Sequence, residues 1–299
     1  MDTTPPRVVL NGTTLTVGEL ITLVDGAAVP EVAPEARERA VRSFRAGRRL
    51  AAAGRLYGRG TGVGAHRAVS VDADDERAHG LRVLRSHAGG AGAVLPARQV
   101  RAMLAIRANQ GDQLPLAEPA PGPRRRRGLP PRRLLRRAPG PRPETVNLTL
   151  LQTAQLSAAR LTAPGDPALT GVPAFLAAGP ASSSGTMILE CTAHSALAEL
   201  RTCAAPASVG HAVLSRGLEE AASFAGQAAR QTLRATEAYR TVLACELVSS
   251  VWALRLHAVP PEIALFAVAD EALPDGTDDR PLTGDVTAAS ELLWRLAQF

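Results

Sequence analysis

The chain has 299 residues, of which 45% are hydrophobic and only 3% aromatic, and all 34 of its Lys or Arg side chains are arginines. This length allows one large domain or two ordinary ones, and an apolar content made mainly of Ala, Leu and Val favours helices over strands. The formal net charge of +6 would favour a nucleic-acid partner, but its distribution argues against one. Nine arginines gather between Pro123 and Arg142, and the remaining 25 are outnumbered by 28 acidic residues, so the basic character is a local patch.

The N-terminal segment combines strand and helix signals. Residues 7–11 and 13–17 flank Gly12, and the Asn11-Gly12 pair is typical of a tight turn, which predicts two short strands around it. A short helix opens near Thr16, and a longer helix is expected over residues 34–53, with Pro34 at its start. The first part of the chain is therefore expected to be a small α+β region.

A glycine-rich segment, Tyr57-Gly-Arg-Gly-Thr-Gly-Val-Gly64, directly follows that helix. With no strand before it, the run is poor support for a phosphate-binding loop. It is either a flexible connector or a loop held over a site, with Tyr57 as its ionisable side chain. Two amphipathic helices follow over residues 74–89 and 96–109.

Residues 118–144 are rich in Pro and contain the nine arginines but no periodic apolar residues. Such a segment cannot bury enough apolar surface to offset the entropy of ordering, so it is interpreted as a solvated, disordered linker. It divides the chain into an N-terminal region, residues 1–117, and a C-terminal helical region, residues 145–299.

The C-terminal region is expected to be a helical bundle. Helices are predicted over residues 146–161 and 187–203, and a long central helix lies within residues 208–257. Its predicted apolar positions recur at helical spacing: Ala221, Ala225, Ala228, Ala229, Leu243, Leu247, Val251 and Leu254.

Cys191, Cys203 and Cys245 all fall within helical patterns, with no CxxC pair and no His at ligand spacing. They predict reduced, buried, structural thiols and no metal site. The N-terminus has neither a basic segment nor an apolar run, and no apolar segment is long enough to span a bilayer, so we expect a cytoplasmic protein without membrane contact.

Several collinear motifs resemble the histidine and phenylalanine ammonia-lyase family, and together they cover most of residues 7–117 and 145–257. They are Val8–Thr16, Tyr57–Gly64, Leu84–Gly92, Leu169–Ala177, Ser184–Ile188, Pro206–Val209 and Ser215–Glu220. The resemblance implies a mainly α fold, a bundle of long central helices assembled as a homotetramer, but with an internal deletion and a chain shorter than complete members.

Members of that family make an electrophile, methylidene-imidazolone (MIO), by cyclising an internal Ala-Ser-Gly. Gly111 resembles the glycine of this triad, but Asn109 and Gln110 precede it, and neither side chain can dehydrate to the alkene. We therefore expect no MIO cofactor. A substitute at Ser183-Ser-Gly185 is not expected to cyclise, because its surroundings match an ordinary loop of the family.

The resemblance also suggests site residues. Tyr57 matches the proposed general base, and Glu219 matches a Glu of the family's Gln-Glu-Asp; we expect both to be vestigial. Gly64, Ser86 and His87 match substrate-binding positions, and Ser86-His87 resembles the pair of histidine-specific members. The alternative without a functional role is that Tyr57 is an aromatic residue of a loop and Glu219 is a carboxylate on a helix surface.

Three functions stay open at this stage. The chain resembles an ammonia-lyase for histidine or a related aromatic amino acid, but we expect it to be inactive alone. It could instead be a non-catalytic subunit that forms homo-oligomers, or hetero-oligomers with an intact lyase. The third alternative is an active lyase or aminomutase with a different electrophile.

Overall fold

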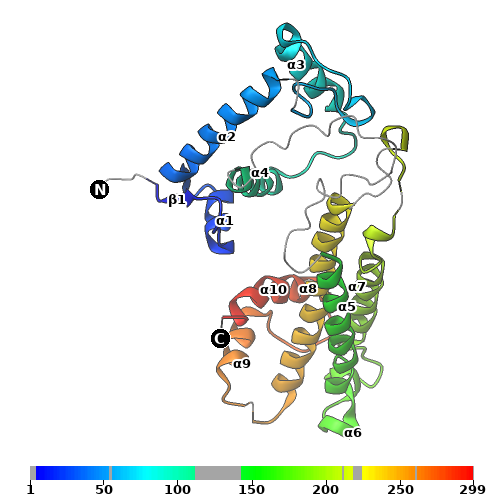
Figure 1. The fold of residues 1–299 in the computed structure, drawn as a ribbon. Helices are drawn as coiled ribbons and strands as arrows, with labels where there is room; N and C mark the ends of the chain where they lie inside the picture. Colours follow the sequence, from blue (N-terminus) through cyan, green and yellow to red (C-terminus); the bar gives the residue numbers. More distant parts are fainter. Residues whose placement is uncertain are drawn as a thin grey trace. The chain divides into compact units, whose positions relative to one another are not determined.

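Figure 1 shows the fold in a computed structural model. The structure describes residues 5–53, 56–111, 143–210, 212–217, 224–259 and 261–298. These residues form two compact units, which are described separately. The first contains the described residues up to Gly111 together with residues 213–217, and the second contains the remainder from Pro143 onward. The predicted linker lies outside the described residues, except that its last two residues begin a helix.

The first unit is mainly helical with one small sheet, as expected from the sequence. Its elements are β1 (Arg7–Leu10), α1 (Val17–Val24), β2 (Val29–Val32), α2 (Pro34–Ala52), α3 (Glu76–His87) and α4 (Ala97–Gly111). The four helices lie close to the predicted ranges.

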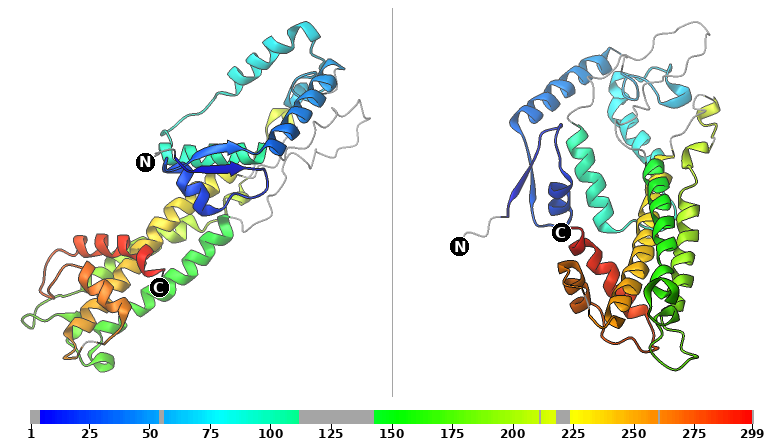
Figure 2. Two further views of the ribbon diagram at one scale, coloured as in Figure 1. Left: turned by 90° about the vertical axis from the view of Figure 1, so that its left-hand side faces the viewer. Right: turned by 90° about the horizontal axis from the view of Figure 1, so that it is seen from below.

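The predicted hairpin around Asn11-Gly12 is wrong. β1 instead pairs in parallel with β2, in a register that runs from Arg7 opposite Val29 to Leu10 opposite Val32. The two parallel arrows are visible in Figure 2, and α1 connects them. A parallel pair needs such a crossover, which a two-residue turn cannot supply.

The side chain of Asn11 explains why residues 13–17 do not form a strand. Its Oδ1 accepts hydrogen bonds from the backbone N–H groups of Thr13 and Thr14, at 2.8 and 2.9 Å. Thr16 then caps α1 and forms a capping box with Glu19. Local side-chain bonds thus satisfy the backbone groups that a strand would have used.

The second unit is a helical bundle. Its helices are α5 (Pro143–Arg160), α6 (Pro167–Thr170), α7 (Met187–Cys203), α8 (Ala225–Leu256), α9 (Ala264–Ala272) and α10 (Thr283–Leu296). The long helices α5, α7 and α8 lie side by side in Figures 1 and 2, and α10 also packs against α8. The predicted helical bundle is confirmed.

The long central helix is shorter than the 208–257 stretch that was expected to contain it. α8 begins at Ala225, directly after Phe224, whose φ of +47° lies in the left-handed region and cannot continue a helix. Before it, the described residues form only short 3-10 turns at Ala207–Val209 and Ser215–Gly217.

The buried face of α8 also differs from the predicted one. Of the predicted apolar positions that are described, only Ala228 and Val251 are buried. Helices α5, α7 and α10 all pack against α8, so the positions of these helices decide which residues of α8 are buried. The spacing of its leucines does not. The buried set comprises Ala228, Gln231, Ala235, Ala238, Val242, Ala244, Cys245, Val248, Ser249, Val251, Trp252 and Ala253.

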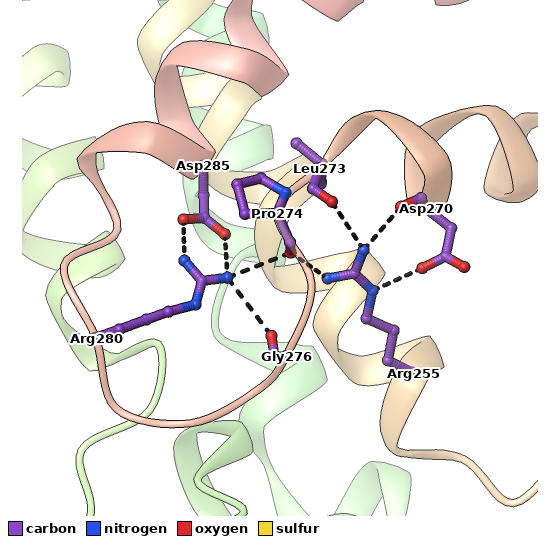
Figure 3. Close-up of polar contacts among 7 residues, drawn as sticks. All are labelled: Arg255, Asp270, Leu273, Pro274, Gly276, Arg280 and Asp285. Carbon is purple, nitrogen blue, oxygen red and sulfur yellow. Dashed lines mark hydrogen bonds and ion pairs between the residues drawn. The ribbon is translucent and has the colours of Figure 1, made fainter.

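Two arginines hold the C-terminal part of the bundle together, and both donate to the carbonyl of Pro274 (Figure 3). Arg255, near the end of α8, donates to the side chain of Asp270 and to the carbonyl of Pro274, at 2.6 and 2.7 Å. Arg280 forms a two-point ion pair with Asp285, whose side chain is 0% exposed. These contacts fix the loop before α10 and thereby close the bundle. Among the described helices, none is long and apolar enough to cross a membrane.

Candidate functional site

Tyr57 and Gly64, two of the predicted site residues, are joined by a hydrogen bond. The phenolic oxygen of Tyr57 accepts from the backbone N–H of Gly64 at 2.8 Å, and the Tyr57 side chain is exposed. Gly64 has φ +56°, a conformation that favours glycine. The glycine-rich segment is therefore a defined turn with its one phenol held against its own backbone.

A short antiparallel pairing closes this turn, which we call the Tyr57 loop (residues 57–71). The N–H of Gly62 donates to Val69 at 2.9 Å, and the N–H of Val71 donates to Gly60 at 3.0 Å. A Cβ atom at Gly62 would lie 2.6 Å from the carbonyl oxygen of His66, so no larger residue fits there without a shift. The glycines allow the chain to fold back tightly.

The Tyr57 loop is attached to α3 by an ion pair between Arg59 and Glu76. Glu76 is the first residue of α3, where a carboxylate also interacts favourably with the helix dipole. The pair therefore anchors the loop at a helix end.

Ser215 contacts the Tyr57 loop although it is 150 positions further along the chain. Its Oγ accepts a hydrogen bond from the backbone N–H of Ala65 at 2.8 Å. Ser215 begins the Ser215–Glu220 motif, whose sequence suggests no role for this serine. The signal that points to it is structural: Ser215 and Arg216 both have positive φ, at +53° and +60°.

Ser86 and His87 lie in the last turn of α3, exposed to solvent. The Nδ1 of His87 lies 2.8 Å from the carbonyl oxygen of Val83, and the Oγ of Ser86 donates to the same carbonyl at 3.1 Å. Neither makes a described hydrogen bond to the Tyr57 loop. Their substrate-binding role stays a prediction.

Gly111 ends α4, and Asn109 two residues earlier is used structurally. Asn109 is 9% exposed, and its Oδ1 accepts a hydrogen bond from the backbone N–H of Gly12 at 2.9 Å. Gln110, the residue between them, is exposed. Helix α4 thus continues through residues 109–111, whose correspondence to a cyclising triad stays a prediction. Glu219 lies outside the described residues.

The Ser183-Ser-Gly185 segment has its backbone donors already engaged. The side chain of Asp279 accepts from the N–H groups of Ser184 and Gly185, at 2.9 and 2.8 Å. These two backbone hydrogen bonds lower the pKa of Asp279 below its usual value. Cyclisation would require the Gly185 nitrogen to attack the Ser183 carbonyl. Here the N–H of Gly185 instead donates a hydrogen bond to the carboxylate of Asp279.

The three thiols are free, but the prediction that all are buried is wrong for Cys191, which is exposed on α7. Cys203 and Cys245 are buried, and burial raises the pKa of both, that of Cys245 to about 12. A helix leaves one side to solvent, and the pattern did not show which side Cys191 occupies. In the described part of the chain, no three His, Cys, Asp or Glu residues are grouped to hold a metal ion.

The comparison with protein families decides the assignment of the chain. The family model described as aromatic amino acid lyase matches residues 15–113 and 141–272, which is more than half of the sequence. The chain belongs to the aromatic amino acid lyase family. The glycine-rich Tyr57 loop and helices α5, α7 and α8 of this lyase-family chain all lie within the matched segments.

Two similar curated proteins are histidine ammonia-lyases. The chain is 32% identical over 155 residues to that of Bradyrhizobium diazoefficiens and 30% identical over 152 residues to that of a Geobacillus species. Each match covers 50% of this lyase-family chain and 30% of the relative, so the chain spans under a third of the length of these curated relatives.

A solved structure supports the fold over nearly the whole length. The ergothioneine-degrading enzyme ergothionase from Treponema denticola has a TM-score of 0.75 at 13% identity, covering 97% of this chain and 99% of that chain. At this identity the likeness shows the fold alone. It agrees with the helical bundle of the second unit.

Proposed function

We propose that this lyase-family chain does not make its own electrophile and therefore does not, by itself, eliminate ammonia from histidine or a related aromatic amino acid. The observation that carries the proposal is the state of residues 109–111. Asn109 is buried and hydrogen-bonded to Gly12, and Gln110 lacks the β-hydroxyl that must leave as water. Without an electrophile, the amino group cannot be converted to a leaving group by this route.

Two further observations support a former amino-acid site. The Tyr57 hydroxyl is presented on a closed loop, as a general base beside a substrate would need. The similarity to two histidine ammonia-lyases supports histidine or a related aromatic amino acid as the ligand class. We therefore propose that Tyr57 is the remaining part of an aromatic amino acid site, and that the roles suggested for Glu219, Ser86 and His87 belong to the same site.

Intact mass and absorbance test the proposal directly. The purified chain should have the mass of its sequence and lack the near-ultraviolet absorbance of a conjugated ring, and it should form no urocanate from histidine or cinnamate from phenylalanine. A mass lower by two water molecules would show that a non-standard electrophile forms. Product formation that is abolished in Tyr57→Phe would overturn the proposal.

A second candidate is a non-catalytic subunit that associates with itself or with an intact lyase. The observation that favours it is the set of large apolar side chains exposed on the long bundle helices. They are Leu148 and Leu156 of α5, Met187 and Ile188 of α7, and Leu233 of α8. Exposed apolar surface of this kind drives association. Light scattering on the soluble protein should show a discrete oligomer, and a folded monomer would refute this candidate.

A further inference from the structure

Two hydroxyl oxygens bind two neighbouring backbone N–H groups in the Tyr57 loop. The oxygen of Tyr57 accepts from Gly64, and the Oγ of Ser215 accepts from Ala65, both at 2.8 Å. The first hydroxyl comes from the loop itself, and the second comes from a segment 150 positions away in sequence. Both residues belong to the first unit.

Gly64 lies so close to the side chain of Ser215 that no side chain at position 64 would fit beside it. A Cβ atom added to Gly64 would lie 2.3 Å from the Oγ of Ser215, far inside van der Waals contact. Gly64 also has φ +56°, so a side chain there would be strained even without the neighbour. Glycine at position 64 therefore meets two requirements at once, and one of them is set by Ser215.

The backbone on the Ser215 side is itself unfavourable. Ser215 and Arg216 are consecutive non-glycine residues in the left-handed region, with φ +53° and +60°. Such conformations persist only where surrounding contacts compensate for them. The described hydrogen bond of the Ser215 side chain is the one to Ala65, and the Arg216 side chain forms no hydrogen bond within the described part of the chain.

We propose that Ser215 is a positioning residue that holds the Tyr57 loop in place by binding Ala65 next to the Gly64–Tyr57 hydrogen bond. Ser215 fixes the amide that follows Gly64, so the Gly64 N–H stays directed at the phenol and the phenol keeps one orientation. The inference rests on the proposed role of Tyr57 in an amino-acid site. Ser215 does not itself touch the reacting atoms in this arrangement; it acts through the backbone of residues 64 and 65.

Fluorine NMR can test this without any catalytic activity. The chain has two tyrosines, Tyr57 and Tyr239, so labelling with 3-fluorotyrosine gives two resonances that Tyr57→Phe and Tyr239→Phe assign. Ser215→Ala should shift or broaden the Tyr57 resonance and leave that of Tyr239 unchanged. Arg216→Ala is the matched control, because Arg216 shares the strained backbone but makes no described bond; it should leave both resonances in place.

Hydrogen exchange supplies a second readout. In Ser215→Ala the amides of Gly64 and Ala65 should exchange about tenfold faster, as expected when a hydrogen bond that holds a turn is lost. Ser215→Gly also removes the hydroxyl but relieves the positive-φ strain, so it keeps the test valid if the alanine variant folds poorly. An unchanged Tyr57 resonance and unchanged exchange in both variants would overturn the proposal.

A double-variant comparison separates close packing from a general effect on folding. Gly64→Ala should disturb the Tyr57 resonance strongly, and adding Ser215→Ala should partly restore it, because the clashing oxygen is then absent. Additive effects of the two changes would contradict direct contact. All these readouts are independent of turnover, so detection of lyase activity would refute the proposed function while leaving this inference to be judged on its own results.

Discussion

The side chain of Asn109 accepts a hydrogen bond from the backbone N–H of Gly12, and this bond joins the end of α4 to the turn that follows β1. The same residue stands two positions before Gly111, the glycine that resembles the one in the family's triad. Asn109 itself is used here to hold the first unit together.

Replacement of Asn109 should destabilise the first unit. Asn109→Ala would leave the buried N–H of Gly12 unpaired, at a cost of about 1–3 kcal/mol. Hydrogen exchange in β1 and α4 should become faster. Both tryptophans, Trp252 and Trp294, lie in the second unit, so the unfolding transition followed by their fluorescence should not change.

Gln110→Ala is the matched control for this experiment. Gln110 is exposed beside Asn109, and its removal should change stability by less than about 0.5 kcal/mol. Equal effects of the two variants would show that the Asn109 hydrogen bond contributes nothing specific.

Removal of Arg280 should destabilise the second unit strongly. Arg280→Met leaves the fully buried carboxylate of Asp285 without its partner, at a cost of about 3 kcal/mol. It also removes the guanidinium that lies 5.3 Å from the centre of the Trp252 ring. Urea unfolding followed by tryptophan fluorescence measures both effects, since Trp252 is itself the probe.

The second variant for Arg280 separates charge from packing. Arg280→Met combined with Asp285→Leu removes both charges and should recover much of the lost stability. Glu237→Gln is the exposed control: Glu237 pairs with Arg240 on the surface of α8, and its loss should cost at most about 1 kcal/mol. A mild effect of Arg280→Met would show that the pair is not essential to the bundle.

A thiol reagent should distinguish the three cysteines. Near neutral pH, a disulfide reagent should modify Cys191 quickly, because it is exposed. Burial raises the pKa of Cys245 to about 12, so its reactive thiolate is scarce as well as inaccessible. Peptide mapping of the native chain should find the label on Cys191, and Cys191→Ser should abolish the fast phase. Rapid labelling of Cys245 would contradict the packing of α8.

The Asp279 contact should make local stability depend on pH. Backbone hydrogen bonds from Ser184 and Gly185 lower its pKa in the folded chain below the usual 3.8. A carboxyl whose folded pKa is lowered contributes stability above its unfolded pKa, and this contribution disappears as the pH falls through the folded pKa. The difference in stability between the native chain and Asp279→Asn should therefore be present at pH 5 and vanish in stronger acid.

Amide exchange at residues 184–185, or thermal unfolding across this pH range, measures that difference. Asp278→Asn is the control, since Asp278 is the adjacent exposed carboxyl and makes no described hydrogen bond. If the difference for Asp279→Asn persisted unchanged far below pH 3.8, the assigned cause of the lowered pKa would be wrong.

Local signals in the sequence predicted most of the helices, and collinear motifs pointed to the family. Pro34 at the start of α2 and the uninterrupted pattern of α7 are local signals, and local backbone preferences and caps specify helix ends without reference to the rest of the chain. The Asn109-Gln110-Gly111 triplet is likewise a local fact, and it carries the proposed function. The 118–144 linker, the role of Glu219 and the cytoplasmic location remain predictions.

Packing between elements determines which distant groups meet. The parallel pairing of β1 with β2, the exposure of Cys191 and the buried face of α8 all depend on where neighbouring elements pack, which periodicity within one element does not encode. The bond from Ala65 to Ser215 is the extreme case. It joins residues 150 positions apart through one hydroxyl and a backbone conformation that serine normally avoids, and only the completed fold makes that conformation favourable.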